Sequence, residues 1–159
     1  MAEHTELTVE TMLKVVAQKF QVAPEDITSE KASQDVLEAR WAFVYLAFRL
    51  VHAARMKKAW EENPERVRGA GFAAMRYFER QIYDELRELF NADYADIRQL
   101  DGEAIKLRET NRAFYDKTEA IWVEIDEAYD LDAGQSGVIW IDRCDTNSGD
   151  EGSQSQEGC

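Results

Sequence analysis

Residues 36–51, VLEARWAFVYLAFRLV, form the longest apolar run in the sequence. The large apolar side chains recur at helical spacing, and the only charged residues are Glu38, Arg40 and Arg49. A helix that is apolar on nearly all sides is one against which other elements pack. We therefore expect this stretch to form the central core helix, ending near residues 50–52.

Charge is distributed unevenly along the 159 residues, which carry a net charge of −13. Residues 40–87 hold ten basic and six acidic residues, whereas residues 1–39 hold three basic and eight acidic ones. Residues 88–159 hold six basic and 18 acidic residues. A basic middle therefore lies between acidic flanks, and the total charge alone does not exclude a nucleic-acid partner.

Helical signals flank the central run, so the sequence predicts an all-α fold. Thr8 is a suitable N-cap for a helix over residues 8–20, and Pro24 a suitable first residue for a second short helix. After the central helix, residues 53–60 predict a short helix and residues 66–90 a longer one, separated by a break at residues 61–64. This order is typical of a helix-turn-helix bundle.

Residues 15–27, VVAQKFQVAPEDI, resemble the opening of the C-terminal DNA-binding domain of DnaA, the bacterial chromosomal replication initiator. Without a gap, residues 40–50, RWAFVYLAFRL, then fall on that family's RQxAMYLARxL helix. The resemblance covers residues 12–82. It implies a Trp-repressor-like helix-turn-helix domain, here over residues 8–90, that binds duplex DNA with the help of a basic loop before the central helix.

The resemblance also implies positions for the DNA contacts. Arg40 falls on an arginine that contacts the phosphate backbone in the family, and Lys31 is the only basic residue left in the loop. The family's DHTT signature falls near residues 67–70, where it is absent, and its preceding arginine falls near Arg66. The candidate DNA-binding residues are Lys31, Arg40, Lys57, Lys58, Arg66, Arg68, Gly69 and Arg76.

Most of these side chains have a second interpretation. Arg68, Arg76 and Arg80 share one helix face, which could contact phosphate and guanine or could be a solvated face paired with neighbouring acids. Lys57 and Lys58 could likewise clamp the DNA backbone or only keep a short helix soluble. If the arginines of residues 66–80 lie exposed on one face, DNA is favoured; if acids of residues 88–130 neutralise them, it is not.

An apolar heptad pattern runs through residues 97–128 and predicts a long amphipathic helix within residues 95–131. Such a helix could pair with a second copy in a coiled coil, bind a protein partner, or fold back on the core. The residues expected at this oligomer or partner interface are Leu100, Leu107, Asn111, Phe114 and Ile121. Beyond it, residues 132–144 include a short β-prone segment, and the acidic residues 145–159 predict a disordered tail.

The sequence offers no constellation for enzymatic chemistry. It contains no clustered nucleophile and base, no phosphate-cradling glycine loop and no metal-ligand set, and its two cysteines both lie near the C-terminus. We expect no cofactor, metal or small-molecule substrate, no membrane contact and a cytoplasmic location. The favoured hypothesis is a non-enzymatic DNA-binding regulator of replication or transcription, of the kind a phage or mobile element encodes. The alternative is an acidic protein-interaction module that has lost DNA binding and acts as an inhibitor or DNA mimic.

Overall fold

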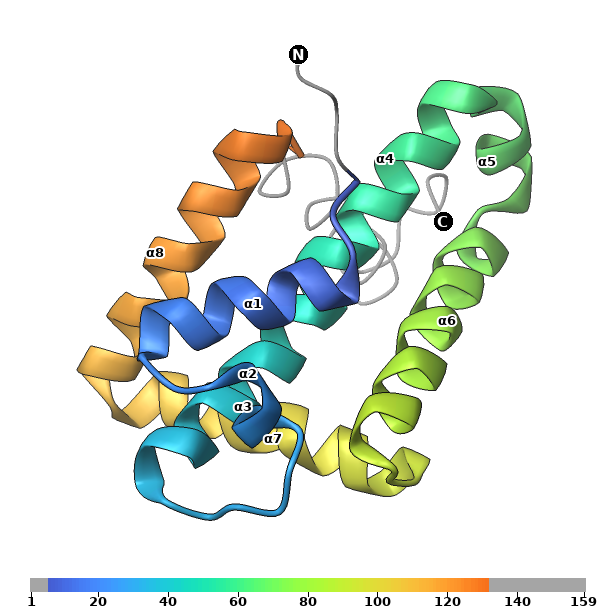
Figure 1. Cartoon of the computed structure of the whole chain (residues 1–159). Helices are drawn as coiled ribbons and strands as arrows, with labels where there is room; N and C mark the ends of the chain where they lie inside the picture. Colours follow the sequence, from blue (N-terminus) through green and yellow to red (C-terminus); the bar gives the residue numbers. More distant parts are fainter. Residues whose placement is uncertain (1–5, 132–159) are drawn as a thin grey trace, which may run out of the picture.

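The computed structural model describes residues 6–131, and every regular element within this range is helical (Figure 1), which confirms the all-α prediction. The elements in chain order are α1 (Val9–Phe20), α2 (Pro24–Ile27), α3 (Gln34–Leu46), the π-helical segment η1 (Ala47–Val51), α4 (His52–Glu62), α5 (Pro64–Ala70), α6 (Phe72–Phe90), α7 (Tyr94–Thr110) and α8 (Arg112–Tyr129). Residues 132–144 and 145–159, for which the sequence predicted a β-prone segment and a disordered tail, lie outside the described residues.

The central helix is longer than expected. α3, η1 and α4 follow one another without a break, so the predicted end near residues 50–52 and the separate helix over 53–60 are wrong. Residues 46–60 contain neither glycine nor proline, and nothing in this segment stops a helix. The chain instead passes through a short π-helical segment, a local widening that shifts the faces of the residues that follow.

α3 forms the centre of the core, as the apolar run predicted. It packs against α1, α2, α7 and α8. Phe43, Leu46 and Leu50 are fully buried. Each of these side chains removes enough apolar surface from water to stabilise the fold by about 1.5–3 kcal/mol.

The starts of the first two helices follow local chemistry, as predicted. Thr8 Oγ1 accepts a hydrogen bond from the Thr11 backbone N–H at 3.0 Å, which caps α1. Gln21 then ends α1 in a left-handed conformation with φ of 60°. Pro24 occupies the first turn of α2, where its missing N–H costs no helical hydrogen bond.

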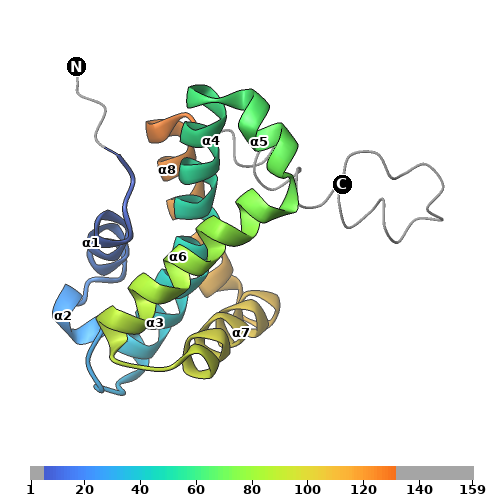
Figure 2. The ribbon, with the colours of Figure 1, turned by 90° about the vertical axis from the view of Figure 1, so that its right-hand side faces the viewer.

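The heptad stretch of residues 97–128 is not one helix. α7 ends at Thr110 and α8 begins at Arg112, because Asn111 adopts an extended conformation and its Oδ1 accepts from the Phe114 N–H at 2.9 Å. Figure 2 shows α7 beside α3, against which it packs, and α8 packs against α1, α3 and α7. The prediction of one long helix is therefore wrong, and of the alternatives it left open the chain takes the one in which these helices fold back on the core.

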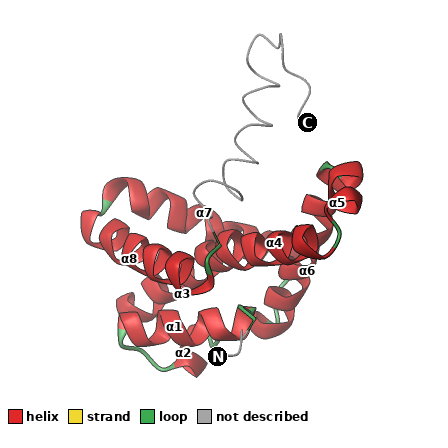
Figure 3. Ribbon diagram, turned by 90° about the horizontal axis from the view of Figure 1, so that it is seen from above, coloured by secondary structure: helices red, strands yellow, loops and turns green. Residues whose placement is uncertain are grey.

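The chain breaks at Asn63, as predicted, and again at Gly71, which divides the expected helix over 66–90 into α5 and α6. Gly71 has φ of +56° and ψ of −124°, a conformation that side chains other than hydrogen rarely permit. Seen from above, the short α5 projects at the tip of the α4–α6 pair, away from α8 (Figure 3). No helix within residues 6–131 is long and apolar enough to cross a membrane.

Candidate nucleic-acid interface

The tip of the molecule carries two exposed arginines on α5. Asn63 Oδ1 accepts from the Arg66 N–H at 3.1 Å and so fixes the start of this short helix. Arg66 and Arg68 are both exposed, and the Arg68 guanidinium lies 5.2 Å from the centre of the Trp60 ring. This cation–π contact orients Arg68 without neutralising its charge.

Two further arginines lie on α6, so the prediction that Arg68, Arg76 and Arg80 share one helix face is wrong, because the break at Gly71 places Arg68 on a different helix. Arg76 and Arg80 lie one helical turn apart, and both are exposed. Among the described residues, neither they nor Arg66 and Arg68 form an ion pair. We call these four residues, Arg66, Arg68, Arg76 and Arg80, the arginine surface. Acids of residues 88–130 do not pair with it.

Gly69 lies between the two arginines of α5 and is exposed. A Cβ placed on it would meet no atom within 4 Å. This position can therefore approach a flat partner closely with its backbone.

Arg40 does not lie on this surface. Its side chain is buried, with only 8% of the residue exposed. Nε donates to the Ile27 carbonyl at 2.7 Å, and Nη2 donates to the carbonyls of Asp26, Ser29 and Lys31 at 3.2, 2.8 and 2.8 Å. The prediction of a phosphate contact is wrong for this geometry, because the guanidinium holds the loop before α3 in place. Burial lowers the Arg40 pKa from its ordinary value.

Three predicted lysines are also engaged within the chain. Lys31 pairs with Asp26 at 3.2 Å, Lys57 with Asp130 at 3.5 Å and Lys58 with Glu6 at 3.4 Å. Lys57 and Lys58 therefore tie α4 to segments near the two ends of the described chain. The loop that carries Lys31 lies at the opposite end of the molecule from α5 in all three ribbon views (Figures 1–3). The structure thus does not bring the predicted loop and the arginine surface together.

The residues expected at an oligomer or partner interface pack within the chain instead. Phe114 and Ile121 are buried in the core, and Leu100 and Leu107 are half-buried against it. Asn111 is the N-cap of α8 rather than the polar centre of a coiled coil. This corrects the prediction of a coiled-coil seam through these residues.

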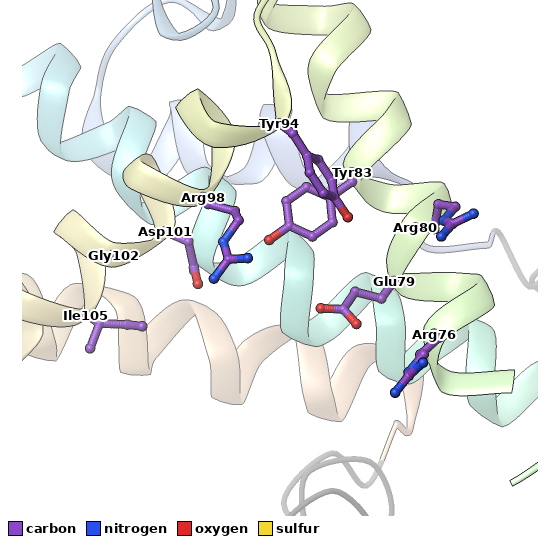
Figure 4. Close-up of a pocket in the computed structure, with 9 residues that line it drawn as sticks. All are labelled: Arg76, Glu79, Arg80, Tyr83, Tyr94, Arg98, Asp101, Gly102 and Ile105. Atoms are coloured by element: carbon purple, nitrogen blue, oxygen red, sulfur yellow. The ribbon is translucent and has the colours of Figure 1, made fainter. Parts of the chain in front are cut away.

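A hollow of about 500 Å³ lies beside the arginine surface, between α6 and α7 (Figure 4). Arg98 of α7 faces it, and Arg76 and Arg80 line its α6 side. Tyr83 and Tyr94 form an aromatic pair at one end, with ring centres 4.3 Å apart. Burial raises the pKa of the Tyr83 phenol above its ordinary value.

Sequence reasoning missed Arg98 and the two tyrosines. Tyr83 lies on α6, whereas Tyr94 and Arg98 lie on α7, and only the packing of α6 on α7 brings them to one hollow. The available signal was the isolated Gly102 in a helical pattern, a position that is unfavourable unless space or close approach is needed.

The described part of the chain contains no group of three or more His, Cys, Asp or Glu residues placed to hold a metal ion. His52, a lone buried histidine, hydrogen-bonds the Met75 carbonyl through Nε2 at 3.0 Å. It therefore ties α4 to α6 behind the arginine surface.

These features define an all-α protein with an exposed arginine surface at one end and a charged hollow beside it. Comparison of the chain with protein-family models, with curated proteins and with solved structures found no match.

Proposed function

We propose that this protein is a non-enzymatic DNA-binding protein that contacts the phosphate backbone of duplex DNA through the arginine surface. The observation that carries the proposal is the contrast between these arginines and the other cations that the sequence predicted to bind DNA. Arg66, Arg68, Arg76 and Arg80 are exposed without ion pairs in the described chain, whereas Lys31, Arg40, Lys57 and Lys58 have partners inside it. Arginine is well suited to phosphate because its planar donors can bind two oxygens at once.

The geometry favours phosphate contact over detailed base reading. Gly69 and Ala70 carry no side-chain donor at the point where a recognition helix would meet base edges. Phosphate contacts supply affinity and orientation but little sequence information. The resemblance of residues 12–82 to the DnaA DNA-binding domain remains in support, and with it the proposal of a regulator of replication or transcription.

The test is fluorescence anisotropy with a labelled random duplex at low salt. Wild-type protein is compared with the double variant Arg66→Ala/Arg68→Ala, which we expect to bind roughly tenfold or more weakly. The matched control is Arg112→Ala/Lys117→Ala, which removes the same charge from exposed positions on α8. An equal loss of duplex affinity in both double variants would show that only the total charge matters, and would contradict binding through the arginine surface.

A second function is favoured by a different observation. Four of the eight predicted DNA-binding residues already have side-chain partners within the chain. An acidic protein-interaction module on the same scaffold would retain these internal contacts and need no DNA. Absence of duplex binding by wild-type protein at low salt would favour this alternative.

A further inference from the structure

The hollow between α6 and α7 is bordered by an aromatic cluster to which a third element also contributes. The π-helical segment η1 supplies Phe48, whose ring centre lies 4.4 Å from that of Tyr83. The ring centre of Tyr83 lies in turn 4.3 Å from that of Tyr94, so three rings on three elements form one continuous series of tilted contacts. Tyr94 is the last ring of this series and is 46% exposed, which leaves an aromatic surface at the mouth of the hollow.

The charges of the hollow are arranged to leave cations free. Asp101 is held by Arg49, whose Nη1 and Nη2 donate to its two carboxylate oxygens at 2.8 and 3.4 Å. Arg98, one turn away on α7, is left without an ion pair among the described residues. Arg76 and Arg80 line the opposite side without an ion pair among the described residues, and Glu79 is the other carboxylate that lines the hollow.

One wall is left open by a residue without a side chain. Gly102 lies in the middle of α7, where glycine is unfavourable relative to alanine. A Cβ added there would meet no atom within 4 Å, so packing against the protein does not require glycine. Its effect is to keep free the space between Arg98 and Ile105 (Figure 4).

We propose that this hollow binds a nucleotide, with the phosphate at Arg98 and Arg76 and the base against Tyr94. Arginine donors match phosphate oxygens, and an aromatic face accepts any base by stacking. A volume of about 500 Å³ is within the range of small-molecule sites. The same chemistry is offered by a free mononucleotide and by an unpaired nucleotide of a strand. This proposal goes beyond the proposed duplex contact and does not depend on it.

The test uses full-length ¹⁵N-labelled protein and follows the Ile105 amide, which lines the hollow and is unchanged in every variant, in two-dimensional NMR spectra. The free-nucleotide arm titrates dAMP, and inorganic phosphate and deoxyadenosine serve as part-ligands. The strand arm compares anisotropy of a duplex bearing a single-nucleotide overhang with that of its blunt form. The variants are Arg98→Ala, which removes a phosphate donor, and Gly102→Leu, which fills the hollow without changing charge. The matched control is Lys106→Ala, on the same helix and outside the hollow.

We expect dAMP, the overhang or both to bind the wild type, and each variant to weaken that binding by about tenfold. Lys106→Ala should leave it unchanged. Gly102→Leu should fold normally, because a Cβ at this position meets no atom within 4 Å and leucine favours helix over glycine. Binding of dAMP to the wild type would identify a free nucleotide as the ligand. Tighter binding of the overhang than of the blunt duplex, without binding of dAMP, would identify an unpaired nucleotide of a strand.

Three results would overturn the proposal. The first is absence of binding in both arms, and the second is equal binding by wild type and Gly102→Leu. The third is an inorganic phosphate affinity equal to that of dAMP, because the base would then contribute nothing. The proposed function is tested separately by binding of blunt duplex, which depends on Arg66 and Arg68. Nucleotide binding in the hollow can be found without duplex binding, and duplex binding without nucleotide binding.

Discussion

The Arg40 guanidinium donates from Nη2 to the Lys31 carbonyl at 2.8 Å, so two residues expected to hold DNA hold each other. The same guanidinium also satisfies carbonyls of Asp26, Ile27 and Ser29. A buried arginine that donates to four carbonyls at the end of α2 and in the loop after it holds this segment in place. The positive charge available to a partner lies elsewhere, on α5 and α6.

Replacing Arg40 should therefore affect stability more than binding. We expect Arg40→Met to lower the free energy of unfolding by about 2–4 kcal/mol, because the buried Ile27 carbonyl loses its donor together with three partly buried hydrogen bonds. Lys31→Ala should change it by less than about 1 kcal/mol, since that residue forms only an exposed ion pair. Urea denaturation followed by circular dichroism measures both. Equal stability of the two variants would show that the Arg40 contacts do not support the loop.

The cap at Asn111 gives a second prediction. Asn111→Ala removes the acceptor for the Phe114 N–H and should cost about 1 kcal/mol of stability. Because the heptad side chains pack within the chain, light scattering should give the same mass for variant and wild type. Asn111→Asp is the matched control, since aspartate also caps helices well. A change of oligomeric state in Asn111→Ala would instead support a coiled coil through this residue.

His52 makes stability depend on pH. Its pKa is lowered by burial; the hydrogen bond to Met75 and the charge of Glu79 act against this, and the charge of Arg55 adds to it. As the pH falls below about 6.5, the unfolded chain takes up a proton at His52 before the folded protein does. The free energy of unfolding should therefore fall from neutral pH into this range and be restored as the pH rises.

Thermal unfolding at several pH values between about 7.5 and 5.5 tests this expectation. The control His52→Gln retains a donor for the Met75 carbonyl but does not titrate, so its stability should fall less over the same range. If wild type and His52→Gln lose stability in parallel, another group is responsible.

The acidic neighbour of the arginine surface gives a fourth prediction. Glu65 is exposed on α5 beside Arg66 and would repel an approaching phosphate. We expect Glu65→Gln to tighten duplex binding by roughly two- to tenfold at low salt, and less at high salt. Glu127→Gln, at an exposed position on α8, controls for the change in net charge. If Glu127→Gln tightened duplex binding as much as Glu65→Gln, the arginine surface would not be the site of DNA binding.

Features decided by local chemistry could be predicted from the sequence. The apolar run gave the buried α3, Thr8 and Pro24 gave the helix starts, and the Asn63-Pro64 pair gave the break after α4. Each depends on residues within about one helical turn of one another. For the same reason the exposed arginines of α5 and α6 could be placed on helices before their surroundings were known.

Features that depend on distant partners could not be predicted. Asn111 suits both a coiled-coil interior and a helix N-cap, and the heptad phase alone does not separate them. The direction of Arg40 depends on carbonyls nine or more residues earlier in the chain. The hollow at Arg98 and Gly102 exists only because α7 packs against α6.

The most direct test of the central claim is the salt dependence of duplex binding. For contacts to phosphate, the logarithm of the association constant falls linearly with the logarithm of salt concentration, with a slope of about −0.9 per contact. Wild-type protein should show such a slope. In Arg66→Ala/Arg68→Ala the slope should be shallower by about 1.8, which corresponds to the loss of two phosphate contacts. A slope that is unchanged in this variant, or absent in the wild type, would contradict phosphate binding by the arginine surface.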